Sequence, residues 1–370
     1  MKRIVSLVLT FVLSIASAFG MSGCGYEYQY PEVLGNYTDH SLAGTTLNVY
    51  NWGEYISDGS EGAIDVIKEF EALTGINVNY STFDSNESMY SLIKYGGVSY
   101  DIVIPSDYMI ERMINEDMLL KIDTSKLSNY SFVDEKYKNL YFDPKNEYSV
   151  PYCVGMVGLI YNTKLVDETP DSWSIMWDKK YKNDVLTFNN PRDAFAIAQF
   201  MLGQSVNTTK KSDWDAAANL LKKQKDVLQA YVMDEVYNKM ESGSAAIAPY
   251  YAGDFLSMLD NNEDLAFVYP KEGTNIFVDS ICIPKNAENY EAAMLFIDYL
   301  LEPEIALANA EFIYYASPNS SVVSNPEYSL YQNEILYPDE KSQPATQYFH
   351  DMDAETRAYF DKLWQDVKLH

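Results

Sequence analysis

Residues 46–80 read TLNVYNWGEYISDGSEGAIDVIKEFEALTGINVNY and contain the unit on which the fold is built. The first five residues alternate between apolar and polar side chains, which is typical of a half-buried strand. Four apolar residues between Ile64 and Leu73 recur on one face of a helix that ends at Gly75. The alternation returns directly after that glycine. This order of strand, helix and strand predicts a β-α-β unit.

The same pattern continues along most of the chain. Strands are expected at residues 100–104, within 148–161, and at 185–188, 245–249, 266–269 and 276–283. Helices are expected at residues 86–96, 110–118, 173–177, 192–203, 213–228, 255–259, 290–301 and 354–367. A chain of 370 residues is too long for one compact domain. We therefore expect an α/β protein of two lobes, each a mostly parallel sheet flanked by helices.

The charge of the chain excludes one class of partner. The sequence contains 54 Asp and Glu residues against 27 Lys and Arg residues, which gives a formal net charge of −27. Such a chain repels a phosphate backbone and an anionic lipid surface. Nucleic acid is therefore excluded as a partner.

Residues and motifs that support catalysis are scarce. The chain has three histidines, His40, His350 and His370, which is few for a His-based triad or metal site. It has no G-x-S-x-G elbow, no Walker-type phosphate loop, no H-E-x-x-H and no paired C-x-x-C. We expect no enzymatic activity, no metal site and no cofactor. Cys153 and Cys282 each lie in an apolar run and are expected to be buried thiols rather than a disulfide framework.

The N-terminal segment has the pattern of an export signal. Met1–Gly23 opens with two basic residues, continues with an apolar run too short to span a bilayer, and closes with small residues. Residues 21–24, MSGC, resemble a bacterial lipobox, which implies that Cys24 is lipidated and becomes the new N-terminus. The polar, tyrosine-rich segment 25–44 is expected to be a tether. An ordinary signal peptide with a stray cysteine is the alternative.

Aromatic and acidic residues follow the predicted strands. Ligands of open α/β sheets bind beyond the carboxyl ends of the strands, so these junctions are the candidate site. The junctions are Trp52-Gly53-Glu54-Tyr55, Ser106-Asp107-Tyr108, Asn189-Asn190-Pro191-Arg192-Asp193, Tyr251-Ala252-Gly253-Asp254 and Phe277-Val278-Asp279-Ser280. Carboxylates replace the water that an ammonium group loses on binding, and aromatic faces attract cations and cover methylene groups. The combination suits a linear polyamine.

Six stretches in this order, NVYNWGEYI, VNYSTFDSNESMY, YDIVIPSDYM, YSVPYCVG, IFVDSICIPKNA and ILYPDE, resemble the spermidine/putrescine-binding proteins of bacterial ABC importers. The resemblance runs from about Thr45 to Asp339. It implies a two-lobed periplasmic-binding-protein fold that closes around its ligand in the cleft between the lobes. It also implies delivery of a polyamine to permease subunits with their ATPase. The implied location is the outer face of the cytoplasmic membrane, or the periplasm if the cell has an outer membrane.

The resemblance implies a division of the chain and a set of ligand contacts. The division is signal peptide 1–23, anchor and tether 24–44, first lobe 45–151, second lobe 152–280, and a return to the first lobe plus C-terminal helices, 281–370. The implied contacts are Trp52, Glu54, Tyr55, Ser106, Tyr108, Asp193, Tyr251, Asp254, Phe277 and Asp279. The chain departs from the family at Asn190, where spermidine binders carry an acid, and at Tyr251, where Trp is usual. Gln347 is a further candidate without a firm anchor in the alignment.

Other interpretations remain open. Among the implied contacts, Trp52 and Phe277 also suit a hydrophobic core, and Glu54 suits a solvated loop. Ser106 suits an N-cap, and Asp193 and Asp254 suit a cap or the first turn of a helix. Asp279 differs, because an unpaired carboxylate in an apolar strand is costly to bury. A receptor for another cationic solute, such as thiamine or ferric iron, is the alternative within the binding proteins. A secreted carbohydrate-active enzyme and a sensor without transport are the alternatives outside them.

Overall fold

The computed structural model describes residues 37, 40–339 and 341–370. The predicted export signal, the predicted lipidation residue Cys24 and most of the predicted tether lie outside the described residues. Within this described part, no helix is both long enough and apolar enough to cross a membrane.

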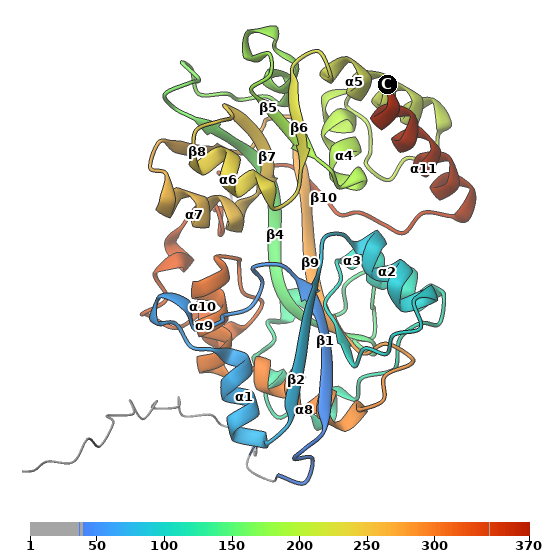
Figure 1. Ribbon diagram of the computed structural model, residues 1–370, viewed down its shortest axis with the longest axis vertical. Coiled ribbons are helices and arrows are strands. Elements are labelled where there is room, and N and C mark those ends of the chain that lie inside the picture. The colour runs from blue at the N-terminus through green and yellow to red at the C-terminus, as the bar shows by residue number, and fades with distance from the viewer. Residues whose placement is uncertain (1–36, 38–39, 340) are drawn as a thin grey trace, which may run out of the picture. The chain divides into compact units, whose positions relative to one another are not determined.

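Strands and helices alternate through the described chain (Figure 1). The strands are β1 (Thr46–Trp52), β2 (Asn77–Phe83), β3 (Ile102–Val103), β4 (Ser149–Asn162), β5 (Val185–Phe188), β6 (Leu228–Val232), β7 (Ile247–Tyr251), β8 (Leu265–Val268), β9 (Thr274–Cys282) and β10 (Thr346–Gln347). The helices are α1 (Val66–Thr74), α2 (Asn86–Tyr95), α3 (Asp107–Asn115), α4 (Pro191–Met201), α5 (Lys211–Gln224), α6 (Glu235–Glu241), α7 (Ala252–Asn261), α8 (Tyr290–Leu300), α9 (Pro303–Ile313), α10 (Ser320–Val323) and α11 (Ala354–Leu369).

The strands are joined in the order β2-β1-β3-β9-β4-β7-β5-β6, with β8 beside β4 and β10 beside β9. The outer strands of each half are parallel to one another: β1 pairs with β2 and β3, and β5 pairs with β6 and β7. The long strands β4 and β9 run antiparallel to each other, and they pass between the two halves (Figure 1). The sheet is therefore mixed, in an α/β fold of two lobes. We call the part around β1–β3 the first lobe and the part around β5–β8 the second lobe.

Local sequence explains where the first elements begin and end. The side chain of Asp65 accepts a hydrogen bond from the backbone N–H of Lys68 and so caps the start of α1. Gly75 ends that helix with a φ of 73°, a conformation that glycine adopts without strain. The apolar face of α1 then packs on a fully buried core with β1 and α8, through residues such as Val49, Phe70 and Phe296.

The boundaries predicted for the lobes, 151/152 and 280/281, fall inside β4 and β9. The pairing of these two strands shifts register between Pro151 and Cys153. The C-terminal helix α11 packs on α4 and α5 of the second lobe, where Phe360 lies against Phe195 and Trp214. Cys153 and Cys282 are both free and buried, which confirms the prediction of buried thiols.

Residues 213–228 do not form one helix as predicted. Helix α5 ends at Gln224, and Leu228 begins β6, which pairs in parallel with β5. The strand is short and mostly half-buried, so its side chains carry little periodic signal. Pairing with β5 decides its conformation. Helices α6, α9 and α10 and strand β10 are likewise absent from the predicted elements.

Candidate functional site

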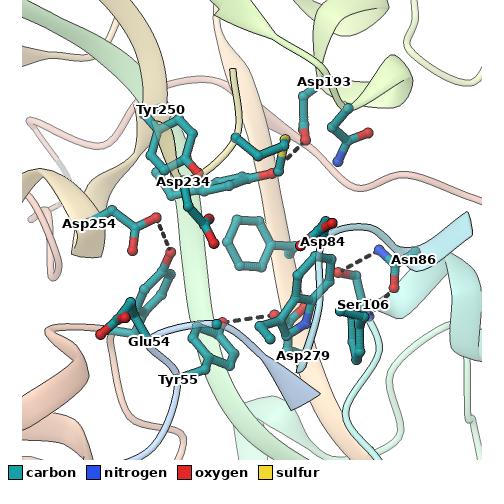
Figure 2. A pocket seen from close by; sticks show the side chains of 18 of the residues that line it. Glu54, Tyr55, Asp84, Asn86, Ser106, Asp193, Asp234, Tyr250, Asp254 and Asp279 are labelled. Carbon is teal, nitrogen blue, oxygen red and sulfur yellow. Dashed lines mark hydrogen bonds between the residues drawn. The ribbon is translucent and has the colours of Figure 1, made fainter. Parts of the chain in front are cut away.

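A pocket lies between the two lobes, with about 740 Å3 of empty space that includes its opening to solvent, and side chains from both lobes line it (Figure 2). All ten residues predicted as ligand contacts line this pocket: Trp52, Glu54, Tyr55, Ser106, Tyr108, Asp193, Tyr251, Asp254, Phe277 and Asp279. The structure therefore brings together residues that are up to 227 positions apart in the sequence.

Most of the lining residues follow the carboxyl ends of strands, as the position of ligand sites in α/β sheets predicts. Glu54 follows β1, Ser106 follows β3, Asp193 follows β5 and Tyr251 ends β7. Asp279 is the exception because it lies within β9. The order of the strands places these ends, which belong to both lobes, around one space.

The turn after β1 has an unusual backbone. Glu54 has a φ of 49°, in the left-handed region that non-glycine residues seldom occupy. At Gly53, a Cβ atom would lie 3.0 Å from Oδ2 of Asp234, so this carboxylate of the second lobe lies against the backbone of the first. A side chain at position 53 would meet the carboxylate.

The pocket is strongly acidic. No Lys, Arg or His is among its lining residues. Seven carboxylates line it: Glu54, Asp84, Asp107, Asp193, Asp234, Asp254 and Asp279. Among the described residues, none of the seven forms an ion pair with a basic side chain. Carboxylates gathered without counter-charges favour a ligand that brings positive charge.

Among the acids that line the pocket, Asp279 is the one with a buried oxygen that lacks a hydrogen-bond partner. Its side chain is 3% exposed, and Oδ2 accepts a 2.8 Å hydrogen bond from the hydroxyl of Tyr55. Oδ1 is buried and accepts no hydrogen bond of ordinary geometry. Burial raises the pKa of Asp279 to about 6, although the Ser106 hydroxyl lies near enough to the carboxyl to lower it. An unsatisfied buried carboxylate oxygen is costly, so its presence in the pocket points to a donor on the ligand.

Tyrosine hydroxyls hold two further acids. The hydroxyl of Tyr251 donates a 2.8 Å hydrogen bond to Asp193, and those of Tyr237 and Tyr315 donate bonds of 2.8 and 2.9 Å to Asp254. Burial raises the pKa of each of these carboxyl groups to about 7. A tyrosine donor orients a carboxylate and leaves its negative charge in place.

Aromatic rings form the walls between these acids. The ring centroids of Trp52 and Phe83 are 4.5 Å apart. Those of Tyr251 and Phe277 are 5.4 Å apart, and these two rings meet edge to face. The indole Nε1 of Trp52 is buried and has no partner. Phe277 packs directly on Gly155, where a Cβ atom would lie 2.2 Å from the ring. Rings in these positions suit the methylene groups between the charges of a polyamine.

Ser106 and Tyr108 lie at the start of α3. Ser106 occupies the N-cap position, but its hydroxyl forms no capping hydrogen bond. It instead accepts a 3.1 Å bond from the side-chain amide of Asn86. The buried hydroxyl of Tyr108 donates to Glu87 at 3.0 Å. Ser106 is therefore the N-cap residue, as the structural interpretation expected, but its hydroxyl is engaged with Asn86 instead of with the helix N–H groups.

Sequence reasoning missed several residues of the pocket, including Asp84, Asp234, Tyr237 and Tyr315. Asp84 follows β2 and Asp234 lies two residues beyond β6, so the strand-end rule would have found both if those strand ends had been predicted correctly. Tyr237 and Tyr315 lie on a helix and in a loop and carry no comparable signal. Gln347 does not line the pocket, and its side-chain oxygen accepts a bond from the backbone of Val206.

Among the described residues, no three His, Cys, Asp or Glu side chains are grouped so as to hold a metal ion.

Comparison with known proteins identifies close relatives. A model of the family described as bacterial extracellular solute-binding protein matches residues 65–335. The spermidine/putrescine-binding periplasmic protein of Escherichia coli K12 is 35% identical over 337 residues, which cover 90% of this chain and 95% of that protein. The putrescine-binding periplasmic protein PotF of the same organism is 29% identical over 313 residues, 79% of this chain and 83% of that protein.

A solved structure agrees with these matches. The spermidine/putrescine ABC transporter substrate-binding protein PotD from Streptococcus pneumoniae aligns with a TM-score of 0.73 and 35% identity. The alignment covers 88% of this chain and 99% of that chain. Fold and sequence therefore point to the same group of proteins.

Proposed function

Because this chain belongs to the bacterial extracellular solute-binding proteins, we propose that it captures a polyamine, spermidine or putrescine, and delivers it to an ABC importer. The family consists of binding proteins and not of enzymes, so a carbohydrate-active enzyme is no longer an alternative. Receptors for thiamine or ferric iron remain the competing assignments within the family.

The observation that carries the proposal is the pocket, with its seven carboxylates, its aromatic walls and no basic lining residue. We propose that the ten predicted contacts bind the ligand. The ammonium groups of the ligand would take the places around Asp193, Asp254 and Asp279, and the rings of Trp52, Tyr251 and Phe277 would cover the alkyl chain. Each ammonium would supply the counter-charge that a buried carboxylate lacks.

We further propose that binding closes the two lobes. The predicted lobe boundaries lie in β4 and β9, and the register shift between Pro151 and Cys153 is a local irregularity at one of them. Hinges are a few residues that absorb a change in backbone angles, and a break in strand pairing offers such a position. A ligand held by both lobes favours the closed form, whose surface the permease and its ATPase would recognise.

The membrane anchor is also part of the proposal. Cys24 in the lipobox-like stretch would carry the lipid that holds the protein on the outer face of the cytoplasmic membrane. Membrane fractionation of a Cys24→Ala variant tests this, since loss of the anchor releases the protein and unchanged membrane association contradicts it.

A thermal-shift measurement tests the ligand class. The purified protein is freed of bound ligand by unfolding and refolding, and its melting temperature is measured with polyamines, thiamine, ferric citrate and sugars. A ligand at 100 times its Kd stabilises the folded state by about 2.7 kcal/mol, so a polyamine should raise the melting temperature by several degrees. A shift with thiamine or ferric citrate and none with any polyamine would falsify the proposal.

A further inference from the structure

Asp84 and Asp234 lie in the pocket, outside the set of predicted contacts. Asp84 follows β2 in the first lobe, and Asp234 lies just beyond β6 in the second lobe. Both residues are exposed, as Glu54 is, whereas the side chains of Asp193 and Asp279 are 3% exposed. The three exposed acids therefore mark the part of the pocket that is open to water, and we call them the mouth carboxylates.

The mouth carboxylates act on one another across the two lobes. Although Asp234 is exposed as a whole, its carboxylate is partly covered, and this partial burial raises its pKa; the charges of Asp84, Glu235 and Glu54 raise it further. The carboxylate of Asp234 also lies against Gly53 of the first lobe. Negative charge from both lobes is thus concentrated in one place, without a basic side chain among the lining residues.

The two buried acids Asp193 and Asp279 are separate from the mouth, whereas Asp254 lies close enough to Asp234 and Glu54 for their charges to raise its pKa, so it belongs to the mouth side of the pocket. Asp193 is held by Tyr251 and Asn275, and Asp279 is held by Tyr55. Figure 2 shows Asp193 in the upper part and Asp279 in the lower part of the pocket, with Asp84 and Asp234 at intermediate heights. The unpartnered Oδ1 of Asp279 is an independent sign that the pocket is built for a ligand with donors.

We propose that Asp84 and Asp234 bind the third ammonium group of a polyamine, so that the receptor selects a triamine such as spermidine over a diamine such as putrescine. The inference rests on the proposed function. A diamine pairs with the two buried positions, because unpaired charge is most costly there. The mouth carboxylates then stay in water, where leaving them unpaired costs little. A triamine reaches all three positions.

Isothermal titration of the double variant Asp84→Asn/Asp234→Asn with spermidine and with putrescine tests the inference. We expect spermidine to bind about tenfold more weakly than to the parent and putrescine to change by about twofold or less, since each lost contact is a partly exposed ion pair. The control is Asp184→Asn/Asp366→Asn, which removes the same two charges at exposed positions outside the pocket. It should leave both affinities close to those of the parent.

The possible results distinguish failure of the proposed function from failure of the role given to Asp84 and Asp234. If the parent protein binds no polyamine, the proposed function itself fails. If the parent binds putrescine as tightly as spermidine, or if the double variant loses both ligands equally or neither, the polyamine assignment stands and the role of Asp84 and Asp234 is wrong. If the control loses spermidine as strongly as the double variant, the effect comes from net charge rather than from the mouth. Melting temperatures of both variants show whether the fold is intact.

Discussion

Hydrogen bonds from tyrosine side chains reduce the free-energy cost of burying the acids of the pocket. Each of Asp193, Asp254 and Asp279 accepts at least one hydrogen bond from a tyrosine. A neutral donor lowers the cost of burying a carboxylate, but it supplies no positive charge. The pocket therefore keeps a deficit of positive charge, and a cationic ligand removes that deficit when it binds.

We predict that Asp279→Asn weakens spermidine binding more than any change at Asn190 does. Removing one partner of a buried charge pair costs about 2 kcal/mol or more, which corresponds to roughly a thirtyfold loss of affinity. Isothermal titration with spermidine measures it. The comparison variant Asn190→Asp adds an acid to the same pocket and should change affinity less.

The unliganded Asp279→Asn protein provides the control for folding. Because burial raises the pKa of Asp279, the neutral amide should leave the melting temperature of the empty protein unchanged or higher above pH 6. If this variant binds spermidine as tightly as the parent does, Asp279 does not bind the ligand.

Among the elements, strand ends place the ligand contacts and helices fix the strands. The C-terminal helix α11 shows how helices support one another, because it packs on α4 and α5, which lie far from it in the sequence. Asp193 lies in the first turn of α4. The packing of α11 therefore supports the helix from which one of the buried acids enters the pocket.

Phe360→Ala in α11 should lower the free energy of unfolding by about 3–5 kcal/mol, because a buried aromatic ring leaves a cavity beside Phe195 and Trp214. Denaturant unfolding measures the change. Glu355→Ala is the control on the same helix: it removes only the exposed ion pair with Lys211 and should cost less than about 1 kcal/mol. Equal effects of the two substitutions would mean that α11 is not part of the core.

For the whole molecule, the acidic pocket links stability to pH. Burial raises the pKa of Asp193 and Asp254 to about 7 and that of Asp279 to about 6. It also raises the pKa of Asp107 and Asp234. In the unfolded chain these groups titrate near pH 4. The stability that they contribute is therefore complete below pH 4 and is lost as the pH rises through 6 to 7.

We therefore expect the empty protein to melt at a lower temperature at pH 8 than at pH 5.5. Spermidine should bind more tightly at pH 8, since its ammonium groups pair with ionised carboxylates, so the ligand-induced shift in melting temperature should also be larger there. Thermal shifts with and without spermidine at the two pH values measure both effects. A ligand-induced shift that does not change with pH would contradict the role of these acids.

The sequence by itself determined the fold class and the ten candidate contacts, because both depend on local signals. Hydrophobic periodicity marks where a strand ends, and in an α/β sheet the residues after a strand face the ligand. Trp52, Ser106 and Asp193 could be found in this way, and the resemblance to polyamine-binding proteins selected among their neighbours. Where the period was weak, as at β6, both the strand and its acid Asp234 were missed.

Only the tertiary structure decided which groups meet in the pocket. Tyr55 donates to Asp279 although 224 residues separate them, and Tyr315 donates to Asp254 across 61 residues. Such pairs depend on the order of strands in the sheet, in which β9 lies between β3 and β4. No local pattern encodes that order, because the free energy that selects it comes from packing and hydrogen bonds between segments far apart in the chain.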